Sequence, residues 1–167
     1  MANKSAFTDD EWNALIDAPQ LVALAVTLSG ASGITGTIKE TFAASKAIVE
    51  GMKSESELIR AICARDEIKA AESGLREALP QLEADDFAAS QQKLATVAFD
   101  RVRAAIAALQ AKAPADLAAY RSFVESLGER VAEAAKEGGF LGFGGERVSA
   151  GEKAMLAKLA EALGGAA

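Results

Sequence analysis

The sequence predicts an all-α protein, an antiparallel bundle of six or seven helices in a single domain over residues 1–167. Three observations carry this prediction. Apolar residues recur at steps of three and four, as on the buried face of a helix. The composition is rich in alanine and only 5% aromatic, so helices can pack closely. Finally, the capping-box pattern S/T-x-x-E, which starts helices, occurs at Thr8–Glu11, Thr37–Glu40, Ser54–Glu57 and Ser149–Glu152.

The first helix is predicted over residues 9–18. Phe7 and Trp12 flank its start at the two positions of a hydrophobic staple, which fixes the angle at which the chain enters a helix. Pro19 disfavours a helical conformation in the residue before it and is well suited to the first turn of a new helix. We therefore expect a second, largely apolar helix over residues 19–29.

The middle of the chain is expected to form three more helices. The spacing predicts them over residues 38–52, 54–79 and 86–111, with a glycine-containing break before the first and Pro80 after the second. In the third, the apolar stripe predicted to face inward consists of Leu94, Val97, Val102, Ile106 and Leu109.

Pro114 opens the next predicted helix, which has the most regular apolar seam of the chain. Its members alternate steps of three and four residues, as in antiparallel bundles. They are Leu117, Tyr120, Val124, Leu127, Val131 and Ala134. A last helix is expected from Ser149 to about Leu163.

A short internal echo suggests two similar helical hairpins with the middle helices as an insertion. Val22-Ala23-x-Ala25 followed by Gly30 corresponds to Val131-Ala132-x-Ala134 followed by Gly139. In each copy a glycine-rich loop and a capped helix follow. The alternative is that the two stretches are similar only by chance, because the chain is rich in alanine.

The charge and the cysteine content of the chain limit which binding partners and which cellular compartment we expect. The chain has 18 Lys+Arg and 24 Asp+Glu, a net charge of −6, so we expect no nucleic-acid partner. Its longest apolar run, residues 21–28, is much shorter than the roughly 20 residues of a membrane span. The single Cys63 has apolar neighbours, which predict a buried thiol with a raised pKa, and its isolation favours a reducing bacterial cytoplasm.

The absence of histidine excludes many catalytic and metal sites. A chain without this residue has no Ser-His-Asp or Cys-His nucleophile, no imidazole base and no histidine-containing zinc or di-iron site. We therefore expect neither enzymatic activity nor a cofactor.

The most distinctive motif is a glycine-rich loop that contains two phenylalanines. It comprises Gly139, Phe140, Leu141, Gly142, Phe143, Gly144 and Gly145. A phosphate-binding loop is disfavoured because Glu146 follows where a lysine is required. Two readings remain open: an apolar plug that folds onto the bundle, and an exposed contact with a partner, a second subunit or a lipid surface.

The C-terminal stretch from Gly145 to Gly164, GERVSAGEKAMLAKLAEALG, resembles the signature of the TerB-like tellurite-resistance family. This resemblance implies an all-helical fold, a role in metal-stress and membrane-linked signalling, and a divalent metal held by acidic residues at the turn. The matching positions are Glu146 and Glu152, although the family usually has Asp-Gly where this chain has Gly145-Glu146.

These features predict a non-enzymatic helical interaction or regulatory module, with self-association as one form of the interaction. Two alternatives are a TerB-like metal or anion sensor and a carrier that holds an apolar small ligand inside the bundle.

If the glycine-rich loop is a contact surface, the double substitution Phe140→Ser/Phe143→Ser removes its two aromatic anchors. We expect this variant to have a lower mass than the wild type by light scattering, or to lose partner binding. An unchanged mass together with unchanged partner binding would rule out the loop as an interface.

Overall fold

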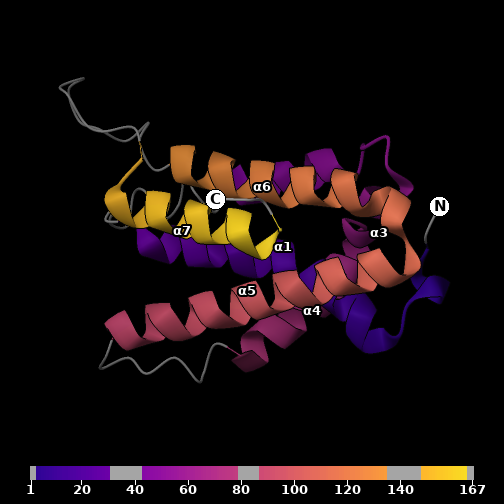
Figure 1. Cartoon of the computed structure of the whole chain (residues 1–167), viewed down its shortest axis with the longest axis horizontal. Helices are drawn as coiled ribbons and strands as arrows, with labels where there is room; N and C mark the ends of the chain where they lie inside the picture. Colours follow the sequence, from indigo (N-terminus) through magenta and orange to yellow (C-terminus); the bar gives the residue numbers. More distant parts are fainter. Residues whose placement is uncertain (1–2, 31–42, 79–86, 135–147, 165–167) are drawn as a thin grey trace.

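The computed structural model describes residues 3–30, 43–78, 87–134 and 148–164, which form helices and turns with no strand among them (Figure 1). The all-α bundle predicted from the sequence is confirmed. Residues 43–51 are also helical. The elements are η1 (Lys4–Ala6), α1 (Asp9–Ser29), α3 (Glu57–Ile62), α4 (Arg65–Ala78), α5 (Phe87–Lys112), η3 (Pro114–Asp116), α6 (Leu117–Ala134) and α7 (Ala150–Ala162).

Helix α1 is at the centre of the bundle and packs against α4, α5, α6 and α7. It runs antiparallel to α5, as two contacts show. At the start of α1, Glu11 pairs with Lys112 from the end of α5. At the end of α1, the Leu28 carbonyl accepts a hydrogen bond from Gln91 near the start of α5. Buried side chains along the whole of α1 account for this central place.

Helices α6 and α7 cover α1 on a second side (Figure 1). They approach closely at Gly128, where a Cβ atom would lie 2.9 Å from Leu159 of α7 and 3.5 Å from Val22 of α1. A side chain at this position would therefore require the Leu159 side chain to move. Of the predicted seam of α6, Tyr120, Val124, Leu127 and Val131 are buried, and the end residues Leu117 and Ala134 are partly buried.

The start of α1 has the local structure that the sequence predicts. Thr8 and Glu11 form a complete capping box, and the Phe7 and Trp12 rings lie 5.8 Å apart between centroids. The indole nitrogen of the buried Trp12 donates a 3.0 Å hydrogen bond to Glu67, which connects α1 to α4. Ser149 and Glu152 form an equally complete capping box at the start of α7.

The predicted break at Pro19 is wrong, because α1 continues through this residue to Ser29. A proline has no N–H group, so the carbonyl of Leu15, four residues earlier, loses its usual helical donor. The structure supplies a substitute from another helix: the Tyr120 hydroxyl donates to the Leu15 oxygen at 3.1 Å. Both Leu15 and Tyr120 are fully buried, so water cannot provide this bond.

The helix predicted over residues 54–79 is two helices, α3 and α4, separated at Cys63 and Ala64. The first packs against α6 and the second against α1. A single straight helix could not pack against both α6 and α1. Ser54 does not form the predicted capping box, since Ser56 caps α3 by accepting from the Ile59 N–H.

The predicted inward stripe of α5 is confirmed except at one residue. Leu94, Val102, Ile106 and Leu109 are buried, whereas Val97 is 43% exposed.

Within the described ranges, no helix has both the length and the apolar character that crossing a membrane requires. The Thr37–Glu40 capping box lies outside the described residues.

The bond between Tyr120 and Leu15 predicts a coupling that a double-mutant cycle measures. Tyr120→Phe leaves a buried carbonyl without a donor and should cost about 1–3 kcal/mol of unfolding free energy. In a Pro19→Ala background, residue 19 regains an N–H aimed at the same carbonyl, so the cost of Tyr120→Phe should be smaller. Equal costs in the two backgrounds, from chemical denaturation, would contradict this account.

The carboxylate of Asp17 is partly buried and lies 3.9 Å from the guanidinium of Arg101. Burial raises the pKa of Asp17, although the charge of Arg101 acts in the opposite direction. A raised pKa means that folding favours the protonated form, so this residue costs stability as the pH rises past the ordinary aspartate pKa. We expect Asp17→Asn to raise the melting temperature at pH 7 more than at pH 3. The same gain at both values would refute the assignment.

Candidate functional site

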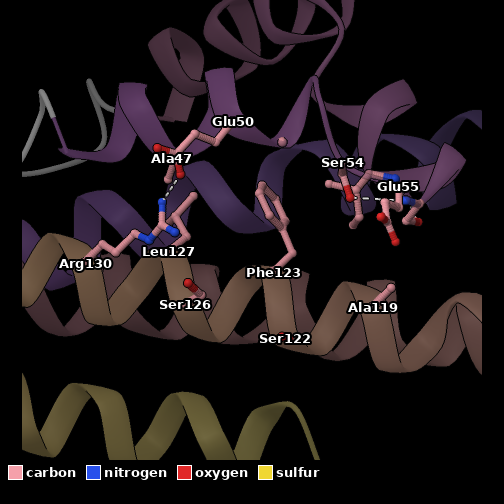
Figure 2. Close-up of a pocket in the computed structure, with 13 residues that line it drawn as sticks. Ala47, Glu50, Ser54, Glu55, Ala119, Ser122, Phe123, Ser126, Leu127 and Arg130 are labelled. Carbon is pink, nitrogen blue, oxygen red and sulfur yellow. Dashed lines mark hydrogen bonds and ion pairs between the residues drawn. The ribbon is translucent and has the colours of Figure 1, made fainter.

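An open groove of about 440 Å³ lies between α6 and the segment from residue 47 to the start of α3. Figure 2 shows α6 along one side and the helical stretch over residues 43–51 along the other. Its wall on α6 is formed by Ala119, Ser122, Phe123, Ser126, Leu127 and Arg130. The opposite wall is formed by Ala47, Glu50, Gly51, Ser54, Glu55, Ser56 and Ile59.

The α6 wall is one continuous face of this helix. Its residues recur at steps of three and four, which places them in a line along the helix. The neighbouring face of α6 carries the buried Tyr120, Val124 and Val131 and packs into the core, and the buried Leu127 lies where the two faces meet. Core packing on one face thus determines which side chains α6 presents to the groove.

Small residues make the groove wide, and Phe123 gives it an apolar base. Ala119, Ser122 and Ser126 leave space along α6, while the Phe123 ring extends toward the opposite wall (Figure 2). There it approaches Gly51, where a Cβ atom would lie 3.0 Å from the ring and 2.5 Å from the Cys63 sulfur. Glycine at position 51 is therefore required by the close packing of Phe123 and Cys63.

Cys63 lies behind this base and does not provide a nucleophile. It is 2% exposed, and burial raises its thiol pKa to about 12, as the sequence predicts. A thiol with this pKa remains protonated at neutral pH, and the thiolate is the reactive form. Cys63 thus acts as a small core residue.

One ion pair joins the two walls, between Glu50 and Arg130 (Figure 2). Both side chains are about half exposed. The hydrogen bond from Arg130 lowers the pKa of Glu50, and the charges of Lys46 and Lys53 act in the same direction. Glu50 is therefore ionised at neutral pH and paired with Arg130.

The structure places only one of the sequence-predicted site residues. The loop from Gly139 to Gly145, with Phe140, Leu141 and Phe143, lies outside the described residues, as does Glu146. Glu152 is described and is 2% exposed. One of its carboxylate oxygens accepts from the Ser149 N–H at 2.7 Å, and the other has no hydrogen-bond partner.

The metal site stays a prediction. In the part of the chain that the structure describes, no three of the Cys, Asp and Glu residues come together in a way that could hold a metal ion. The role that Glu152 visibly performs is to cap α7.

Sequence reasoning did not find the groove. Its two walls are about 70 residues apart in the chain, and alanine, serine and glycine at these positions are typical of any closely packed helix surface. One signal was present, the regular spacing of the α6 face.

Comparisons of the chain with protein-family models, with curated proteins and with solved structures gave no match. The resemblance to the TerB-like family therefore stays a prediction from the sequence.

Proposed function

We propose that this protein is a non-enzymatic interaction module that binds a short amphipathic segment of a partner protein in the groove between α6 and residues 47–59. The observation that carries the proposal is the groove itself, which combines an apolar base with a polar rim. Phe123, Leu127 and Ile59 provide the base. Serine hydroxyl groups and charged side chains form the rim, where a bound segment can satisfy its polar groups.

The shape of the groove favours a partner segment over an enclosed small ligand. A carrier would hold its ligand in the interior, whereas the interior gap lined by Ile16, Cys63 and Phe123, in the part of the chain that the structure describes, has only about 10 Å³. This is about the space of a single water molecule. The groove, in contrast, is open along the helix, which suits a chain that enters and leaves at its ends.

The test uses a random-peptide phage library selected against the wild-type protein. Ala119→Trp places a large side chain in the groove, and we expect it to abolish binding of the selected peptides. The matched control is Ala107→Trp, the same change at an exposed position of α5, which should bind as the wild type does. Both variants are checked for unchanged helicity by circular dichroism.

Two results would overturn the proposal. One is a selection that enriches no peptide. The other is a set of peptides that binds Ala119→Trp as well as Ala107→Trp, which would place their site elsewhere on the surface.

A further inference from the structure

We infer that the segment bound in the groove is an amphipathic α-helix with a basic residue at the end of the groove where Glu55 lies. This inference rests on the proposed function and specifies the conformation and the charge of the partner. The juxtaposition behind it is of small side chains along α6 with a facing wall whose main chain is engaged in its own hydrogen bonds.

The main chain of the groove walls favours a helix over an extended strand. A peptide that binds as a strand pairs with a row of free N–H and C=O groups at the edge of a sheet. On one wall, α6 uses these groups for its own helical hydrogen bonds. On the other, residues 47–51 are helical, and the Ser54 N–H donates to the Gly51 carbonyl. The Ser54 and Glu55 carbonyls accept from the Arg60 guanidinium at 2.5 and 2.9 Å. A helix satisfies its own main chain, so it suits such walls better than a strand does.

The α6 wall has the length and the side chains that suit a second helix. From Ala119 to Arg130 it extends over about 16 Å, the length of a helix of about three turns. Ala119, Ser122 and Ser126 are small, so a helix that lies along α6 can approach it closely. Apolar residues of that helix at steps of three and four share one face, which can cover Phe123 at the base of the groove.

The charged residues that line the groove favour a cation in the partner. Arg130 is paired with Glu50, so among the described lining residues the carboxylate of Glu55 has no cation of its own. Glu55 is exposed and lies at the opposite end of the groove from this pair (Figure 2). Arg60, five residues further along, binds main-chain carbonyls and pairs with Glu57. A lysine or arginine of the partner therefore has a carboxylate to pair with, and the net charge of −6 attracts a cationic helix.

The experiment on conformation uses the phage-selected peptides whose binding is abolished by Ala119→Trp. We expect their apolar residues to recur at steps of three and four, with a lysine or arginine nearby. Proline at a position between these apolar residues should weaken binding at least tenfold, because proline breaks a helix, whereas alanine at the same position should leave binding unchanged. Circular dichroism should show that the peptide gains helix on binding.

The experiment on charge uses the same peptides with a variant of the groove. Glu55→Lys should weaken their binding about three- to fivefold, as expected for the loss of an exposed charge contact, and the effect should shrink as ionic strength rises. The matched control is Glu125→Lys, an equal change of charge at an exposed position of α6 that does not line the groove. It should bind as the wild type does.

The outcomes separate this inference from the proposed function. Three results overturn the inference and leave the proposed function standing: groove-dependent peptides that tolerate proline, that alternate apolar and polar residues as a strand does, or that bind Glu55→Lys as well as Glu125→Lys. A selection that yields no groove-dependent peptide overturns both.

Discussion

The hydrogen bond from Tyr120 to the Leu15 carbonyl is the interaction on which the rest of the structure depends. Helix α1 packs against four other helices, so a break at Pro19 would divide the central element of the bundle. The proline leaves one buried carbonyl without a helical donor, and Tyr120 provides a donor from α6. The bond also joins α1 to the part of α6 that precedes the groove residues Phe123, Leu127 and Arg130.

What could be predicted from the sequence is mainly what depends on neighbouring residues. The Thr8–Glu11 and Ser149–Glu152 capping boxes and the Phe7–Trp12 contact each form within a single turn, and all are present. The steps of three and four likewise identify the buried face of α6, because core packing follows helical periodicity. The all-α fold follows from such local signals.

The predictions that failed are those in which a distant contact overrides a local preference. Pro19 is a helix breaker by local rules, and only a tyrosine about 100 residues away makes its place in α1 acceptable. The chain divides at Cys63 because α3 and α4 pack against different helices, which no pattern within residues 54–79 indicates. The groove belongs to the same class, since neither wall is distinctive until the fold brings Glu50 and Arg130 together.

The base of the groove is part of the core, and this has a consequence for binding. Phe123 packs against the hydrophobic core and also lines the groove, and its ring and the Cys63 sulfur both lie so close to Gly51 that this residue can have no side chain. The apolar base is therefore held in place before any partner arrives. A surface already ordered loses little conformational entropy on binding, which favours binding of the proposed partner segment. In an alanine-rich protein with few aromatic residues, one well-supported phenylalanine can thus provide the anchor that a larger aromatic cluster provides elsewhere.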